Sequence, residues 1–142
     1  RWVIVGRNPA PAVQRLAGDG VVVTGQVVDD LPYLQQAAVY VIPMRFGGGS
    51  RLKLLQAMAC ALPIVSTTLG ADGVEVTAGE QLLVEDDPQR FAQAVLRLLA
   101  DRQQGRQLGE AGRRLIAAYD WDVVALRLEA TYAAALAEAG GR

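Results

Sequence analysis

Histidine is absent from this 142-residue sequence, and cysteine occurs once, at Cys60. Without an imidazole the chain holds no Ser-His or Cys-His nucleophilic pair and no histidine-ligated metal of its own. A single thiol cannot close an intrachain disulfide, which favours a reducing, cytoplasmic setting and a buried packing role for Cys60. We therefore predict no metal site.

An excess of charge of either sign is also missing. The sequence has 14 Lys and Arg against 15 Asp and Glu, a formal net charge of -1 and a pI near 5.4. No positive field is available to attract a polyanion, so we expect no nucleic-acid partner. No apolar run is long enough to span a bilayer, and no signal-peptide pattern occurs, so no transmembrane segment is expected. The sequence begins at Arg1 in a strand-like run, which indicates a piece of a longer protein.

The apolar residues that are present alternate between two patterns. About half of the residues are apolar, enough for a single domain over residues 1–142 with a sizeable core. Strand-like runs are predicted at residues 2–6, 21–25, 39–43, 63–67 and 81–85, and helices at 9–18, 31–37 and 51–61 lie between them. Helices alone follow at 88–100, 103–119 and 122–139. This order predicts an α/β fold in three layers, a parallel sheet with helices on both faces, and a helical C-terminus.

Some structural roles follow from helix signals. We interpret the acidic pair Asp86 and Asp87 as the cap of the helix that begins at Pro88, in preference to a metal or acid-catalysis site. In the helix at 51–61 a set of residues recurs at helical spacing and is expected to face the sheet, joined by Cys60. That set is Leu52, Leu55, Met58 and Ala59.

The segment RFGGGSRLK between a strand and a helix is the strongest functional signal. Gly47, Gly48 and Gly49 permit positive φ and close approach of a ligand to the backbone, and Ser50 is placed to cap the helix from residue 51. Arg51 and Lys53 put two cations at the positive end of that helix, which is unfavourable unless an anion binds there. A flexible glycine turn and a solvated surface cation are the alternatives. The spacing alone predicts a phosphate or nucleotide site of unspecified type.

The run VIPMRFGGGSRLKLLQAMACALPIVSTTLGADGVEV resembles the donor-binding half of family-4, group 1 glycosyltransferases. WVIVGRNP, VVVTGQVVDDLPYLQQAAVYVIP, LLVEDDPQRFAQAVLRLLAD and YDWDVVALRLEATYAAAL follow the family's order of elements through nearly the whole chain. The resemblance implies a GT-B fold, in which two Rossmann-like domains face each other across a cleft. This chain would be the C-terminal domain, its partners being a nucleoside-diphosphate-sugar donor and its own N-terminal acceptor domain. It also implies retention of anomeric configuration, with no cofactor and no obligatory metal.

The resemblance assigns site residues by position. The glycine-rich loop and the following helix would hold the phosphates and sugar, and Gln56 stands where the family has a glutamate for the ribose. Gly48 stands where a second family glutamate would lie, so both carboxylates are missing. An amide makes weaker, uncharged bonds to hydroxyls, so donor binding is expected to be attenuated.

Other positions match the family near the nucleobase and at the last helix. Gly25, Gln26 and Val27 would lie near the base, with a structural turn as the alternative. Gly6 ends the first strand and would let the base or ribose come close, with a simple strand-exit glycine as the alternative. Trp121 matches an aromatic at the start of the last helix, where we expect packing.

The match also implies what would lie outside the sequence. The family's preceding strand and helix, which supply an arginine and a lysine to the diphosphate, would come before Arg1, and the acceptor domain would come before them. The chain alone is therefore not expected to catalyse transfer, and no catalytic residue is assigned. The full-length enzyme is expected in the cytoplasm, peripheral to the inner membrane through the missing domain.

Two other functions stay open. A non-catalytic nucleotide-binding or interaction domain would explain the lost glutamates, whereas a GT-B epimerase is disfavoured because its expected histidine and carboxylates are not visible. The last helix carries an apolar stripe, so self-association or a mobile C-terminus is expected. The stripe is formed by Val124, Leu128, Tyr132 and Leu136.

Overall fold

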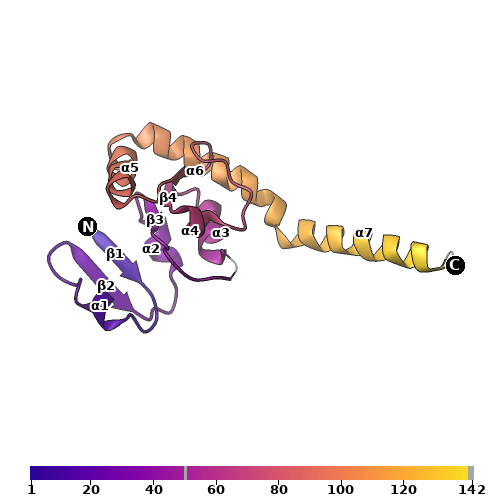
Figure 1. Cartoon of the computed structure of the whole chain (residues 1–142), viewed down its shortest axis with the longest axis horizontal. Coiled ribbons are helices and arrows are strands. Elements are labelled where there is room, and N and C mark those ends of the chain that lie inside the picture. Colours follow the sequence, from indigo (N-terminus) through magenta and orange to yellow (C-terminus); the bar gives the residue numbers. More distant parts are fainter. Residues whose placement is uncertain (50, 141–142) are drawn as a thin grey trace.

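The computed structural model describes residues 1–49 and 51–140, and Figure 1 shows their course. Strands in this part of the chain lie at the five predicted places, most of them shorter than predicted by one to three residues. They are β1 (Trp2–Val5), β2 (Val21–Gly25), β3 (Tyr40–Ile42), β4 (Ile64–Ser66) and β5 (Leu83–Val84).

Helices alternate with these strands and then continue alone to the C-terminus, which confirms the predicted order. They are α1 (Pro11–Gln14), α2 (Leu31–Gln35), α3 (Leu52–Ala59), α4 (Thr68–Ala71), α5 (Pro88–Ala100), α6 (Arg102–Ile116), the 3-10 turn η1 (Ala117–Tyr119) and α7 (Trp121–Gly140). The short helix α4 was not predicted. Thr67 caps it by accepting a hydrogen bond from the Gly70 N–H at 3.1 Å. The surrounding sequence is typical of a loop, so this capping residue was not recognised.

All the strand pairs are parallel, as predicted, but the strands form two sheets within the described residues rather than one. β1 pairs with β2, and β3, β4 and β5 form a second sheet in that order. In Figure 1, β1 lies between β2 and the three-stranded sheet. Each sheet therefore presents an edge strand toward the other, β1 on one side and β3 on the other.

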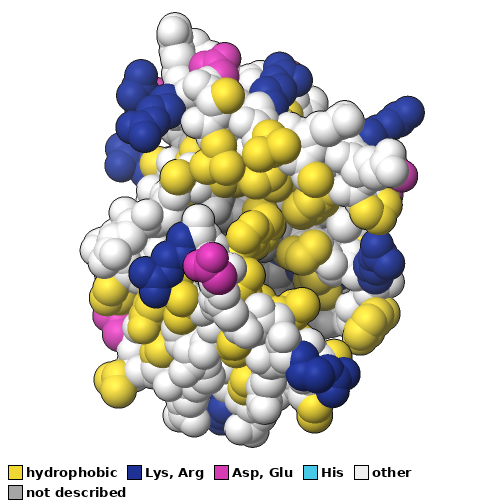
Figure 2. All heavy atoms as spheres, turned by 90° about the vertical axis from the view of Figure 1, so that its left-hand side faces the viewer, with side chains coloured by type: hydrophobic (Ala, Val, Ile, Leu, Met, Phe, Trp, Pro, Cys, Tyr) yellow, Lys and Arg dark blue, Asp and Glu magenta, His cyan; other side chains and the backbone are white. Residues whose placement is uncertain are grey.

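The face that includes these edges is apolar. Figure 2 looks at the molecule from the side of the N-terminus and shows apolar side chains gathered across a hollowed middle region. On β1, Trp2 is 51% exposed and Val3 is 45% exposed. Exposed apolar side chains on an edge strand are typical of a surface that another segment covers.

Helices cover both faces of the three-stranded sheet, which confirms the three-layer prediction. One cluster of buried side chains joins Ile42 and Ile64 to the buried face of α3. A second cluster joins Val65 to α5 on the opposite face. The α6 helix contributes to both, because Leu108 lies in the second cluster and Leu115 packs against the first. Successive residues of β4 thus serve opposite layers, as a strand requires.

The predicted buried face of α3 was partly wrong. Leu52 is 66% exposed and Ala59 is exposed, whereas Leu54, Ala57 and Met58 are buried. The helix is apolar on more than one side, so its sequence is compatible with burial of either side. Contact with α6 and β4 determines which side is buried. Cys60 is half-buried against the first cluster, consistent with a packing role.

Helix α7 leaves the rest of the molecule and projects as a separate rod (Figure 1). Its predicted apolar stripe is exposed in this chain, from Val124 to Leu136. Trp121 at its start is 84% exposed, so the predicted packing of this ring is wrong for this chain. None of the helices described between residues 1 and 140 combines the length and apolarity that a bilayer crossing needs.

Candidate nucleotide-binding site

The glycine-rich segment follows β3 and leads into α3. Gly47 has φ 116° and Gly49 has φ 98°, so both occupy the left-handed region that glycine tolerates. Gly48 has open space around the position of a Cβ. The prediction that Ser50 caps the helix falls on a residue outside the described part of the chain. The segment is therefore shaped by glycine at the point where loops of parallel sheets bind ligands.

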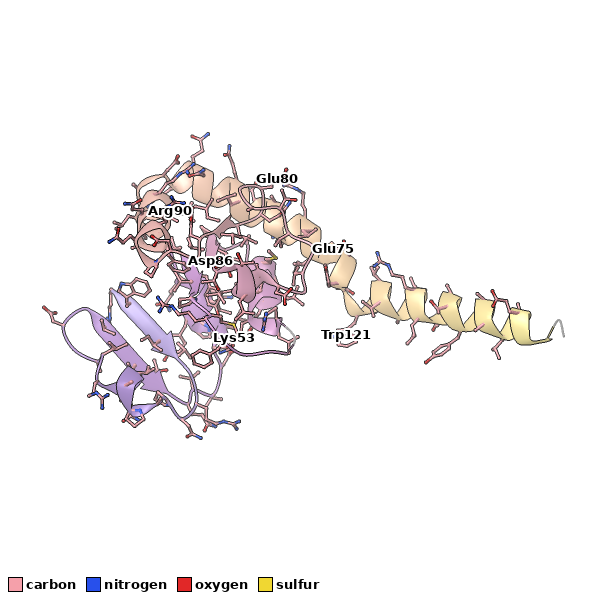
Figure 3. All side chains as sticks on the ribbon, in the orientation of Figure 1. Lys53, Glu75, Glu80, Asp86, Arg90 and Trp121 are labelled. Carbon is pink, nitrogen blue, oxygen red and sulfur yellow. The ribbon has the colours of Figure 1, made fainter. Side chains whose placement is uncertain are left out.

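Arg51 and Lys53 both lie at the start of α3, as predicted. Arg51 occupies the position before Leu52, and its Nη1 donates to the Gly49 carbonyl at 3.2 Å. Its Nε is buried and has no hydrogen-bond partner among the described residues. Lys53 is exposed in the first turn, and Figure 3 shows it on this helix. Two cations thus stand at the positive end of a helix without an acidic residue in its first turn.

Gln56 lies one turn further along α3 and is exposed. Its Nε2 donates to Asp30 Oδ1 at 3.0 Å. Asp30 precedes α2 and does not cap it, whereas its neighbour Asp29 accepts a hydrogen bond from the Leu31 N–H at 2.9 Å. The carboxylate of Asp30 is thereby left to join α3 to the loop after β2. Burial first, and then the negative charge of Asp30, raise the pKa of Tyr40.

Gly6 and the Gly25–Val27 loop meet at the carboxyl ends of β1 and β2. The Gly6 N–H donates to the Gly25 carbonyl at 3.2 Å. Gly25 has φ 70°, which lets the chain turn sharply out of β2. Gln26 is exposed and Val27 is half-buried. The structure therefore brings these predicted positions together, and Asp30 connects their loop to Gln56.

A cleft of about 540 Å³ lies at the carboxyl ends of the three-stranded sheet. It is lined by Met44, Arg45, Thr67, Thr68, Leu69, Asp72 and Asp86. Asp87 caps α5 as predicted, accepting from the Gln89 and Arg90 N–H groups at 3.0 and 2.9 Å. Asp86 does not share in that cap, because it accepts hydrogen bonds from Thr68 instead. These bonds lower the pKa of Asp86.

The sequence analysis did not identify Asp30 as a residue of the candidate site. The residues Asp29, Asp30 and Pro32 read as an ordinary helix start, and nothing in their spacing indicates which acid caps and which reaches another helix. Within the described residues no group of three or more acidic or thiol side chains is placed to hold a metal ion.

Parallel strands, a glycine-shaped loop and a cationic helix start at the carboxyl edge define an open α/β domain whose loop and helix start lie where such folds place their ligands. Comparison with known proteins identifies the family to which this domain belongs. Residues 1–101 match the family model described as "Glycosyl transferases group 1", and the chain belongs to that family. Its fold is that of a GT-B glycosyltransferase domain.

Related proteins cover more than four fifths of the chain. A GDP-mannose-dependent alpha-(1-6)-phosphatidylinositol monomannoside mannosyltransferase from Mycobacterium tuberculosis is 33% identical, over 89% of this chain and 37% of that protein. A D-inositol 3-phosphate glycosyltransferase from Salinispora arenicola is 32% identical, over 81% of this chain and 26% of that protein. This chain therefore spans only about a third of the relatives' length.

A solved structure supports the same fold. The sucrose-phosphate synthase of Thermosynechococcus elongatus superimposes with a TM-score of 0.77 and 28% identity, covering 96% of this chain and 38% of that one. The match includes nearly every residue of the chain, so the helical C-terminus belongs to the shared fold.

Proposed function

We propose that this chain is the donor-binding domain of a retaining glycosyltransferase that moves a sugar from a nucleoside diphosphate to an acceptor. An N-terminal domain of the same protein would bind the acceptor and complete the active site. The reaction would take place in the cytoplasm. It would take place at the membrane surface if the acceptor is a lipid, and the name of the mycobacterial relative indicates a lipid acceptor for that protein.

The start of α3 carries the diphosphate in this proposal. Arg51 and Lys53 neutralise the phosphates, and backbone N–H groups of the glycine-rich segment donate to phosphate and sugar oxygens. The charge that develops on the leaving diphosphate then meets dipoles that are already oriented, which is the main way such a site lowers a barrier. Gly6, Gln26 and Val27 line the side of the base and ribose.

The division into two sheets supports a further part of the proposal. β1 and β3 each present an unpaired edge toward the other sheet, and Trp2 and Val3 lie exposed there. A parallel strand from a segment of the full-length protein that precedes Arg1 would pair with both edges and join the sheets. The same segment would bring further cations to the diphosphate.

The single observation that supports the function best is the cationic, glycine-led helix start at the carboxyl end of β3. It predicts that the chain binds a nucleoside diphosphate more tightly than the matching nucleoside. Calorimetric or NMR titration with GDP and guanosine, then UDP and uridine, tests this. Equal affinity for diphosphate and nucleoside would contradict a phosphate-centred site.

A non-catalytic nucleotide-binding domain is the second candidate, favoured by the absence of both family glutamates at Gly48 and Gln56. Restoring the carboxylate in the full-length protein separates the two. The change Gln56→Glu is made together with Asp30→Asn, because Asp30 Oδ1 lies 3.0 Å from Gln56 Nε2 and two carboxylates would repel. If transferase activity stays at background in both the parent and this variant, the non-catalytic function is supported.

A further inference from the structure

The bond between Asp30 and Gln56 leaves a specific set of groups facing solvent. Gln56 must point its Nε2 at Asp30, because its oxygen would meet another acceptor there. Its Oε1 is then directed elsewhere. The second carboxylate oxygen of Asp30 makes no hydrogen bond with the described residues. Two acceptor oxygens, one of them charged, thus remain on the two exposed side chains that this bond joins.

Two neighbouring acceptors are complementary to two neighbouring hydroxyl donors. A vicinal diol of a sugar offers that pair, and a carboxylate accepts such bonds more strongly than a neutral group does. Lys53 lies three residues before Gln56 on the same side of α3 and adds a cation next to the diol position. The loop that contains Gln26 and Val27 leads directly to Asp30, at the start of α2.

We propose that Asp30, held by Gln56, is the carboxylate that binds the ribose diol of the donor nucleotide. This inference rests on the proposed nucleotide-binding function. The amide at residue 56 then positions an acid from the loop before α2, and that acid supplies the negative charge that α3 lacks at residue 56. Asp30 is a specificity residue for ribose, and Gln56 is its positioning residue.

The competing explanation is that the bond only ties α2 to α3. A tie between exposed polar side chains contributes little to stability and nothing to ligand discrimination. The two explanations therefore predict different effects of an Asp30 substitution on the affinity for a ligand with the ribose diol and for one without it.

The test uses the 142-residue chain and a panel of GDP, UDP and ADP. Whichever binds tightest is compared with its 2′,3′-dideoxy form, in the wild type and in Asp30→Asn. We expect Asp30→Asn to weaken the ribonucleotide by about ten- to a hundredfold, the range for one charge-assisted bond, and to leave the dideoxy form nearly unchanged. Thermal melting checks that the variant folds.

The reciprocal pair Asp30→Asn with Gln56→Glu provides the matched control. It keeps one carboxylate and one amide in contact with their places exchanged, so it should recover most of the lost affinity. Gln56→Glu alone should bind less tightly than the pair, because it sets two carboxylates against each other.

Two results would overturn the proposal separately from the function. The first is that Asp30→Asn weakens binding of the dideoxy form as much as binding of the ribonucleotide. The second is that Asp30→Asn changes neither affinity while Lys53→Ala still lowers both. In either case Asp30 does not bind the diol, and the proposed diphosphate site is unaffected. If no diphosphate of the panel binds the wild type, the proposed function and this inference fall together.

Discussion

Asp86 accepts two hydrogen bonds from Thr68, one from its N–H at 2.8 Å and one from its hydroxyl at 2.7 Å. The pair joins the end of the three-stranded sheet to the start of α4, at the cleft beside the glycine-rich segment. The bonds favour the ionised carboxylate, which is why its pKa lies below the ordinary value of 3.8.

The first prediction concerns pH. A carboxyl group whose pKa is lower in the folded state adds stability above its unfolded pKa and loses that contribution as pH falls through the folded value. Asp86→Asn should therefore melt at a lower temperature than the wild type at pH 6, and the difference should shrink in strong acid. Melting curves followed by circular dichroism from pH 6 to pH 2 measure it. A difference that is constant with pH would exclude the ionised carboxylate as the cause.

The second prediction concerns the cations of α3. Lys53→Ala and Arg51→Ala should each weaken diphosphate binding by about ten- to a hundredfold, since a charge-assisted contact contributes about 1.5–3 kcal/mol. Lys53 is exposed, so its variant should melt like the wild type. Arg127→Ala, on the projecting helix α7, is the matched control and should bind normally. A lower melting temperature with unchanged affinity would make either cation structural.

The third prediction tests the packing of α6 on α3. A Cβ at Gly109 would collide with the backbone carbonyl of Ala61. Such a backbone clash costs about 3 kcal/mol, against a gain of about 1 kcal/mol in helix propensity. Gly109→Ala should therefore lower the free energy of unfolding by about 2 kcal/mol. Gly18→Ala, where nothing lies within 4 Å, should change it by less than about 0.5 kcal/mol. Equal denaturant midpoints would contradict the close approach of α6.

The fourth prediction concerns the facing sheet edges. The Trp2 N–H donates to the Gly20 carbonyl just before β2 and the Gly6 N–H to the Gly25 carbonyl of β2. By alternation, the N–H groups of Val3 and Val5 point to the free edge. Because the Tyr40 N–H bonds to Pro63, that of Val41 also points to a free edge. These three amides should exchange with deuterium much faster than those of Ile4 and Ile42. In a longer protein that contains the preceding segment they should become protected, and continued fast exchange there would contradict strand insertion.

The order of strands and helices could be predicted because each short β-branched run and each capped helix carries its own local signal. Asp87 before Pro88 specified the start of α5 from two residues. The division of the strands into two sheets could not be predicted, because it depends on which edges find partners across the chain. The prediction of the buried face of α3 was partly wrong for a related reason. Both Leu52 and Leu54 suit an apolar helix face, and only contact with α6 determines which of them is buried.

The candidate site was predictable where one segment carries the whole signal. Gly47, Gly49, Arg51 and Lys53 lie within seven residues, and backbone geometry and helix charge act locally there. Asp30 was not predictable, because it lies 26 residues before Gln56 and its role depends on Asp29 making the bond at the start of α2. Sequence patterns show which acids are present but not which of them is left free.

The final prediction concerns α7, whose stripe of Val124, Leu128, Tyr132 and Leu136 is between 37% and 73% exposed. An apolar stripe of this length is costly in water, so copies of this chain should pair through it at high concentration. Sedimentation over a wide concentration range should show association in the wild type. Leu128→Glu should abolish association, whereas Ala130→Glu, on the opposite side of the helix, should not. Hydrogen exchange across residues 121–138 completes the test: a strict monomer whose final helix is fully protected would show that the stripe finds its cover within one chain.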